Sequence, residues 1–480
     1  MGWHPCAPSP FQRHPWPTEL LEEKTRRLLI GKRRVIGSTT FAMRQADGEF
    51  IASGASKLTV LNSTLPLRDH PMRVLHFNTH ASGGSYEYAT VLCDGLAKEG
   101  IESRLLCKAL PPARGSRLLF DRLIRRSFVS LSREPWHGTR RLLLPPDSKE
   151  LEGIDVIHLH TVADWFNVPS WLGALPKRMG VVITLHDLWH ISGGCFLYNG
   201  LNNYLNGCRS CPILRWPASE FLARDEYSRK LQAYRDCGAQ MVASSRWLAG
   251  IAEQSPIAKA CGGVRVIPPG IDTAVFRPQH KRQCREELAL PREAFVIATG
   301  CTSLTDTNKN VPWLLEQLSR LPDLKNVRVL VFGEGSVPVP DGLDVQFTGG
   351  LVDRRNLARV FAAADVFVTA SLMETYGLTL VEAMGCGTPV VAFRIGGIPE
   401  AAPDKQVGLL CEPLNGPDLL AVVGELRSSP ELRQGLGSAA SELAFTRNAK
   451  IQFAAAFAQI YRDCLKAAKA DLDNQLVRPV

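Results

Sequence analysis

The 480-residue sequence lacks any uninterrupted apolar stretch approaching the ~20 residues that a membrane-spanning helix needs. Its opening segment, MGWHPCAPSPFQRHPWP, has no continuous apolar core of a signal peptide. Internal repeats and long low-complexity segments are missing too, so nothing indicates a repeat protein. Together these absences predict a soluble chain that stays in the cytoplasm.

The cysteines do not form the pattern of a disulfide framework. There are 13 of them, an odd number, scattered through predicted strands and helices, which is typical of reduced thiols. The composition is otherwise ordinary for a globular protein, with 45% hydrophobic and 21% charged residues. A chain of this length is sufficient for two or three domains with sizeable cores.

A net charge of +9 would suit nucleic acid or an anionic membrane, but no nucleic-acid-binding motif accompanies it. Much of the excess lies in the first 141 residues. Residues 113–141 alone carry eight arginines among apolar residues. This segment predicts either a basic amphipathic helix at a membrane surface or a helix packed on the core with one solvated face.

From Met72 onward, short apolar segments alternate with helical patterns, which predicts parallel, doubly wound sheets of the α/β class. Two series of strands are predicted, at 73–77, 101–107, 156–159, 181–185 and 241–243, and at 295–299, 327–332, 345–348, 366–369 and 390–392. Sites on open α/β sheets form beyond the carboxyl ends of the strands. Residues 1–71 show no clear periodic pattern of apolar residues and are predicted to be an N-terminal arm. The arm could be disordered, a small added element or an artefact of an upstream start site.

The most informative stretch is TASLMETYGLTLVEAMGCGTPVVAFRIGGIPE, at residues 369–400. Two carboxylates, Glu374 and Glu382, flank a glycine turn at Gly377 that opens a predicted helix. With a rise of ~1.5 Å per residue, eight positions place these carboxylates on the order of 10 Å apart, which suits a nucleotide sugar. Backbone amides at the helix N-terminus, near Tyr376, Gly377 and Leu378, suit a diphosphate between them.

This stretch resembles the E-x7-E signature of the retaining glycosyltransferases of family 4, which have the GT-B fold of two Rossmann-like domains facing across a cleft. The resemblance extends over S-x-x-E-T-Y-G-L, E-A-M-x-C-G-T-P-V-V-A and G-G-I-P-E. It implies that Glu374 holds the hydroxyls of the donor sugar and that Glu382 holds the ribose. Amides of Tyr376, Gly377 and Leu378 would bind the diphosphate.

The resemblance also implies the domain plan. The sequence PPGIDTAVFRP, at residues 268–278, is similar to the family's linker between domains, with Pro269 where asparagine is usual. An acceptor domain is expected at 72–279 and a nucleotide-sugar donor domain at 280–447. The segment 448–480 is expected to contain a helix that returns to the first domain.

Further donor-binding residues follow from the same resemblance. Lys309 lies where the family places a cation against the diphosphate, where it would offset the charge of the leaving group. The family's arginine about five positions earlier is replaced by Leu304, as in a Ser-Leu-Thr-Asp variant from polysaccharide synthesis. The turn at Gly333 is expected to approach the nucleotide base. The glycines of this turn do not have the number and spacing of a dinucleotide-binding fingerprint.

In the first domain, Gly83 and Gly84 form a turn after the first predicted strand, which matches the family's glycine loop near phosphate or acceptor. His186 ends a predicted buried strand and resembles the histidine of the family's T-x-H-D motif. It is expected to position the sugar or to support oxocarbenium-like charge, the alternative being a structural histidine. His158 and His160 also end a strand, without a motif.

Cys195, Cys208 and Cys211 resemble the cysteine-bearing insertion of colanic-acid-type polysaccharide glycosyltransferases. Relatives with this insertion are expected to have a fourth cysteine that is missing here. A tetrahedral zinc site would therefore need His190 or another ligand from outside the loop. The preferred prediction is instead a loop that lines the acceptor side, with cysteines that are relics or packing residues.

The resulting prediction is a metal-independent, cofactor-free retaining glycosyltransferase of polysaccharide biosynthesis. It would move a hexose-type unit from a nucleoside diphosphate sugar to a saccharide or lipid-linked acceptor, in the cytoplasm or in peripheral contact with the inner face of the plasma membrane. The resemblance implies front-side displacement, in which the leaving phosphate helps deprotonate the acceptor hydroxyl. The alternative is a non-catalytic GT-B protein that binds a nucleotide sugar or a partner.

Overall fold

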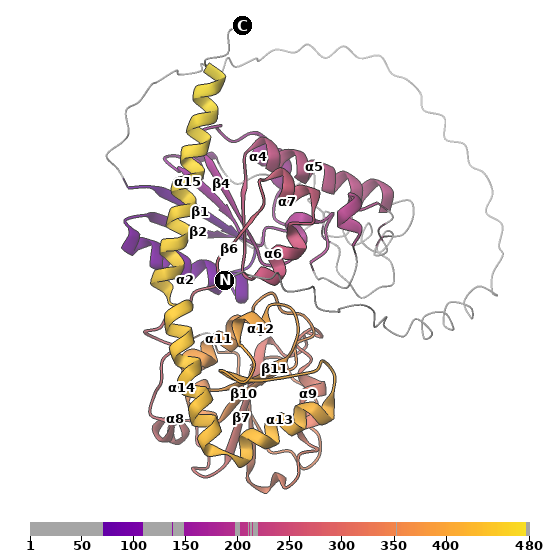
Figure 1. Ribbon diagram of the computed structural model, residues 1–480, viewed down its shortest axis with the longest axis vertical. Helices are drawn as coiled ribbons and strands as arrows, with labels where there is room; N and C mark the ends of the chain where they lie inside the picture. The colour runs from indigo at the N-terminus through magenta and orange to yellow at the C-terminus, as the bar shows by residue number, and fades with distance from the viewer. Residues whose placement is uncertain are drawn as a thin grey trace, which may run out of the picture. The chain divides into compact units, whose positions relative to one another are not determined.

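The computed structural model describes residues 71–108, 137, 148–196, 202–209, 211, 214, 219–351 and 353–476 (Figure 1). The predicted arm at 1–71, except Pro71, and the predicted basic segment at 113–141, except His137, lie outside the described residues. Among the described helices, none combines the length and apolar character needed to cross a membrane.

The first sheet has six parallel strands in the order β2, β1, β3, β4, β5, β6. Its strands are β1 (Arg73–Asn78), β2 (Glu102–Cys107), β3 (Val156–Leu159), β4 (Gly180–Leu185), β5 (Gln240–Ala243) and β6 (Val264–Val266). Strands β3 and β4 are buried along their whole length, because helices cover both faces of the sheet. The strand order reverses between β1 and β3, which makes their carboxyl ends the expected ligand-binding edge.

The second sheet is also six-stranded and parallel, in the order β12, β11, β10, β7, β8, β9. Its strands are β7 (Phe295–Ser303), β8 (Val327–Glu334), β9 (Val345–Gly349), β10 (Val366–Thr369), β11 (Val390–Phe393) and β12 (Gly408–Cys411). Here the order reverses between β7 and β10. The loops that follow these two strands carry Lys309 and Glu374 respectively.

Helices connect the strands of each sheet. They are α2 (Gly84–Leu96), α4 (Val168–Gly173), α5 (Arg224–Asp236), α6 (Arg246–Ala252), α7 (Pro256–Ala260), α8 (Lys281–Glu287), α9 (Val311–Leu318), α10 (Arg354–Ala363), α11 (Leu378–Gly385), α12 (Ile398–Ala401), α13 (Gly416–Ser428), α14 (Pro430–Arg447) and α15 (Lys450–Leu476). Several begin at a side-chain cap: Ser245 accepts from the amide of Leu248, and Ser429 accepts from that of Leu432, with Pro430 at the first helical position.

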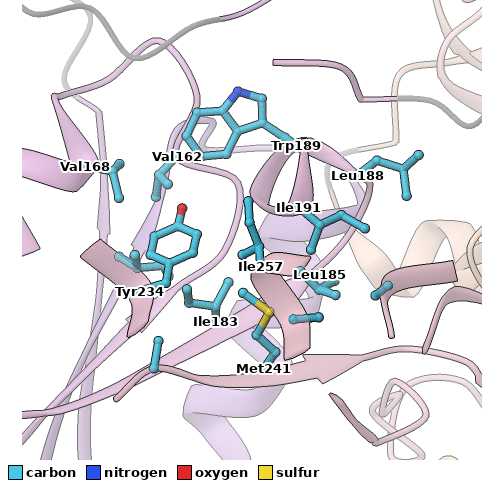
Figure 2. Packing of buried hydrophobic residues seen from close by; sticks show 14 of the residues in the cluster. Val162, Val168, Ile183, Leu185, Leu188, Trp189, Ile191, Tyr234, Met241 and Ile257 are labelled. Carbon is cyan, nitrogen blue, oxygen red and sulfur yellow. The ribbon is translucent and has the colours of Figure 1, made fainter. Parts of the chain in front are cut away.

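Alternation along the first sheet separates its two faces. On one face, odd-numbered residues of β4 such as Ile183 and Leu185 pack with α4, α5 and α7, and Figure 2 shows them beneath Trp189 and Tyr234. On the other face, Val182 and its neighbours pack against α2 and α15. The core in Figure 2 thus supports the turn that follows β4.

Helix α15, yellow in Figure 1, packs on the second of these faces. Its side chains Phe453, Phe457 and Tyr461 are buried against Tyr88 of α2 and Val182 of β4. Residues 453–465 of α15 therefore complete the core of a sheet whose strands all come from residues 73–266.

The predicted fold class is confirmed, since both doubly wound parallel sheets form. Every predicted strand is present, and most strand ends lie within one or two residues of the predicted ends. Strand β7 is longer than predicted, because it continues to Ser303. Two edge strands, β6 and β12, were not predicted. The predicted domain boundary near residue 280 falls between the last strand of the first sheet and the first strand of the second.

Candidate active site

Glu374 lies in the loop between β10 and α11, and two glycines hold its backbone in place. Gly397 donates its amide hydrogen to the carbonyl oxygen of Glu374 at 3.0 Å. A Cβ at Gly396 or Gly397 would lie 2.0 Å from the carbonyl oxygen of Glu374 or Thr375 respectively, a distance that no side chain tolerates. The Gly-Gly pair of the motif is therefore required by close approach of two backbones.

Lys309 is brought to Glu374 by contacts between their loops. The side-chain amide of Asn308 donates to the carbonyl of Met373 at 3.0 Å, and the amide of Leu372 donates to the carbonyl of Asn308 at 2.8 Å. The Lys309 ammonium then forms a hydrogen-bonded ion pair with the Glu374 carboxylate. Burial lowers the pKa of Lys309, but the Glu374 carboxylate outweighs burial and leaves that pKa raised, so Lys309 stays a cation.

Helix α11 begins beside this ion pair. Gly377 precedes it with a positive φ of 95°, a conformation that glycine adopts without strain. The first amides of a helix have no acceptor within it, and here they carry the partial positive charge that suits a diphosphate. The side chain of Tyr376 is already occupied: it is buried, accepts a hydrogen bond from Asn448 at 3.1 Å and leaves only its backbone for a ligand.

Glu382 lies one turn inside α11, with 3% of its surface exposed. Burial raises the pKa of its carboxyl group to about 7, a rise that Arg354 opposes and Glu87 adds to. Arg354, the first residue of α10, forms an ion pair with Glu382 and a second one, at 3.4 Å, with Glu87 of α2. Each carboxylate of the E-x7-E pair therefore has its own basic partner.

The three predicted glycines differ in what requires them. Gly83 has a positive φ of 89° at the start of α2, and a Cβ at Gly83 or Gly84 would meet nothing within 4 Å. This loop is open at a helix N-terminus. Gly333 has a φ of 138°, and a Cβ there would lie 2.2 Å from the carbonyl oxygen of Cys301 on the neighbouring strand. The packing of β7 against β8 alone therefore requires glycine at position 333.

His186 follows β4 and is half-buried. Its Nε2 lies 3.1 Å from Nδ1 of His160, and the Tyr88 ring stands edge-on to it at 4.8 Å between centroids. Burial lowers the pKa of His186 to about 3, so the ring is neutral. Asp187 closes the turn by accepting the amide hydrogen of Trp189 at 2.7 Å, and burial raises the pKa of Asp187 to about 7.

Both halves of the chain match models of known glycosyltransferases. Residues 82–275 match the model described as Glycosyltransferase Family 4, and residues 296–428 match Glycosyl transferases group 1. The D-inositol 3-phosphate glycosyltransferase of Mycobacterium marinum is 36% identical over 430 residues, 82% of this chain and 84% of that protein. The chain belongs to glycosyltransferase family 4.

Other relatives and solved structures match this family 4 glycosyltransferase to different extents. The D-inositol 3-phosphate glycosyltransferase of Segniliparus rotundus is 34% identical over 37% of this chain, and the match spans only 42% of that relative's length. Sucrose-phosphate synthase from Thermosynechococcus elongatus, at 19% identity, and Anabaena HepE in complex with UDP-glucose, at 16%, each match 82% of this chain and 100% of their own. Their TM-scores of 0.57 and 0.54 support the GT-B fold.

In this glycosyltransferase, the loop that carries Cys195, Cys208 and Cys211, here called the cysteine loop, is held by contacts among neighbouring residues. The Cys208 sulfur accepts the amide hydrogen of Gly193 at 3.0 Å, and burial raises the pKa of Cys208 to about 11. A hydrogen bond with Cys211, together with burial, holds the pKa of the Cys195 thiol above its usual range. His190, the predicted outside ligand, already bonds through both ring nitrogens, to Tyr234 at 2.9 Å and to a backbone carbonyl at 2.7 Å. The preferred interpretation, a loop without metal that lines the acceptor side, stays a prediction, and zinc at the three cysteines stays its alternative.

Three buried histidines near His186 were missed as a group by sequence reasoning. Among the described residues, the ligand atoms of His76, His158 and His160 lie within 4.8 Å of one another. His76 stands in the middle of an apolar strand and carries no motif. Only the adjacency of β1, β3 and β4 in the sheet brings these rings together with His186.

Proposed function

We propose that this enzyme transfers a hexose-type unit, with retention of configuration, from a nucleoside diphosphate sugar to a saccharide or lipid-linked acceptor in polysaccharide biosynthesis. The observation that carries this proposal is the Lys309–Glu374 ion pair beside the N-terminus of α11. A fixed cation and oriented amides at one point suit a diphosphate leaving group.

The donor is proposed to extend from this point in both directions. The Lys309 ammonium and the amides at Gly377 and Leu378 would hold the diphosphate. Glu374 would turn from Lys309 to the sugar hydroxyls, and Glu382, deeper in α11, would accept from the ribose hydroxyls. The proposed roles of Gly83, Gly84 and Gly333 are backbone approach to the donor or acceptor.

Retention would follow from front-side attack, in which a bond forms from the acceptor oxygen to the anomeric carbon as the bond to phosphate breaks. The acceptor proton passes to the departing phosphate oxygen. His186 is neutral and half-buried, which suits a ligand to the sugar. This route requires neither metal nor cofactor.

The donor base and the acceptor rest on different observations. HepE was solved with UDP-glucose, which favours a uridine donor as the first to test. The name of the Mycobacterium marinum relative favours a phosphorylated polyol as acceptor. The cysteine loop instead favours the polysaccharide branch, with an acceptor met in the cytoplasm or at the inner face of the plasma membrane.

A donor screen tests the proposal against the non-catalytic alternative. Purified protein is incubated with UDP-, GDP- and ADP-glucose, and both the melting temperature and the slow hydrolysis of each donor are measured. We expect one donor to raise the melting temperature and to be hydrolysed, and Glu374→Gln to abolish hydrolysis. Glu425→Gln, on the exposed side of α13, is the matched control.

A stabilising donor that is never hydrolysed, with or without a simple glucoside or inositol phosphate as acceptor, would favour the binding protein. Hydrolysis that survives Glu374→Gln would contradict the role given to this carboxylate.

A further inference from the structure

Four histidines gather on one face of the first sheet. His76 in β1, His158 in β3, His160 just after β3 and His186 just after β4 occupy positions of the same parity as Val74, Val156 and Val182, which face α2 and α15. Because β3 lies between β1 and β4, their rings come into contact near the carboxyl edge of the sheet.

Three of these rings form a chain of hydrogen bonds. Nδ1 of His76 lies 3.1 Å from Nε2 of His160, and Nδ1 of His160 lies 3.1 Å from Nε2 of His186. His76 and His160 are fully buried, whereas His186 is half-buried. Within the described part of the chain, Nδ1 of His186 has no hydrogen-bond partner and is not among the atoms sealed from solvent.

All three rings are neutral. Burial lowers the pKa of His76 and of His186 to about 3, and lowers that of His160 well below its usual value. A neutral imidazole has one N–H and one lone pair, so His160 must donate in one of its two bonds and accept in the other. The two hydrogen bonds therefore run in the same direction, either outward from His76 to His186 or inward from His186 to His76.

The buried end of the chain decides between the two directions. Nε2 of His76 is sealed from solvent and has no partner among the described residues. In the inward direction this atom would carry a hydrogen, leaving a buried N–H without an acceptor, which is rarely tolerated in folded proteins. In the outward direction it carries only a lone pair.

We propose that His76 and His160 are positioning residues that hold His186 as its Nδ1–H tautomer. His186 then presents a hydrogen-bond donor at its accessible nitrogen, for an oxygen of the donor sugar. The contact with the sugar rests on the proposed function, whereas the tautomer does not. In this state Nε2 of His186 accepts from His160, so no nitrogen of His186 is free to remove the acceptor proton.

A metal ion is the competing explanation for three close imidazoles. Both nitrogens of His158 are already bonded, to the hydroxyl groups of Tyr461 and Thr184 at 2.7 Å each. Both nitrogens of His160 are bonded as well. A buried dication would break these bonds, and among the described residues no carboxylate belongs to this group of possible ligands to balance its charge.

The tautomer is measured directly by 15N-correlated NMR of the histidine rings in the full-length protein at neutral pH. His186 is assigned by comparison with His186→Gln. We expect a protonated Nδ1 and a bare Nε2 for His186 in the wild type. His160→Asn keeps an N–H near the position of Nδ1 and should preserve this pattern. His160→Leu removes that N–H, so His186 should become a mixture of its Nδ1–H and Nε2–H tautomers.

The sugar contact is tested with UDP and UDP-glucose as probes. The extra rise in melting temperature that UDP-glucose gives over UDP should shrink in His160→Leu and persist in His160→Asn. Hydrolysis of UDP-glucose should fall about ten-fold in His160→Leu, the loss expected for one well-placed hydrogen bond. The shift given by UDP alone should not change, because the proposed contact of His186 is with the sugar and not with the nucleotide.

Each outcome bears on a separate claim. A His186 protonated at Nε2 in the wild type, or one equivalent of bound metal in the purified protein, overturns the tautomer assignment. The wild-type spectrum gives this result even if His160→Leu fails to fold. If His186 is protonated at Nδ1 but UDP-glucose neither raises the melting temperature nor is hydrolysed, the tautomer assignment stands. That result counts against the proposed function with a uridine donor.

Discussion

At the scale of single residues, donor turnover should depend strongly on Lys309. Lys309→Met removes the cation next to the diphosphate and leaves the mostly buried Glu374 carboxylate without its partner. We expect donor turnover to fall by roughly 10²–10³, the loss typical of one fixed electrostatic contact in an active site. Donor hydrolysis measures it, with the exposed Lys325→Met as control. An equal loss in both variants would contradict a specific role.

The buried carboxyl group of Glu382 should make stability depend on pH. Its pKa rises from 4.5 to about 7 on folding, so the folded state binds the proton more tightly. Stability from this group is present below pH 4.5, and is lost as the pH rises to about 7. Glu382→Gln should abolish this loss, which is on the order of 3 kcal/mol. Denaturant unfolding of both proteins from about pH 4 to about pH 8, at one ionic strength, measures the difference.

The two proteins should therefore diverge as the pH rises. A constant difference between them across that range would show instead that Arg354 keeps Glu382 ionised throughout.

The motif residues could be selected from the sequence because each lies close to another recognisable feature of the sequence, and their roles in catalysis stay predictions. Glu374, Gly377 and Glu382 sit within nine positions of one another, and Lys309 follows a recognisable strand. The histidine chain was not predictable in this way. His76 and His160 are 84 residues apart, and only the order of the strands makes them neighbours.

At the scale of elements, the loop that carries Glu374 depends on Gly397. A Cβ there would lie 2.0 Å from the carbonyl oxygen of Thr375, so Gly397→Ala must push the two backbones apart. We expect a loss of stability of about 1–3 kcal/mol, as for overpacked sites, and a weaker donor-induced rise in melting temperature.

Gly424→Ala is the matched control for this change. It lies inside α13, where a Cβ would meet nothing within 4 Å, so alanine should raise helix stability by roughly 0.5–1 kcal/mol. Thermal unfolding with and without donor measures both variants. If Gly397→Ala behaved like Gly424→Ala, the close approach would not constrain the loop.

The elements that sequence reasoning missed are the edge strands. β6 has only three residues, two of them exposed, so it lacks an apolar run. β12 begins at Gly408, whose missing side chain allows close approach to Val390 of β11. Edge strands gain their conformation from pairing with a neighbour, and a single sequence does not show that neighbour.

At the scale of the whole chain, α15 packs on the face of the first sheet that carries Val182. Phe457 is fully buried there, against His158 and Tyr88. Phe457→Ala should cost about 3–5 kcal/mol of unfolding free energy, through lost burial and the cavity left behind. The exposed Ile451→Ala, on the same helix, should change it little. Chemical denaturation of both variants gives the comparison, and equal effects would contradict the packing role of this helix.

The path of α15 also bears on how the protein is made. Tyr461 bonds to His158 across 303 residues of sequence, so the core of the first sheet is completed by residues that are synthesised long after its strands. A nascent chain emerging from the ribosome therefore exposes the apolar surface of β1, β3 and β4 until α15 has been synthesised. We expect the chain to depend on chaperones during that interval, and fragments that stop before residue 450 should aggregate.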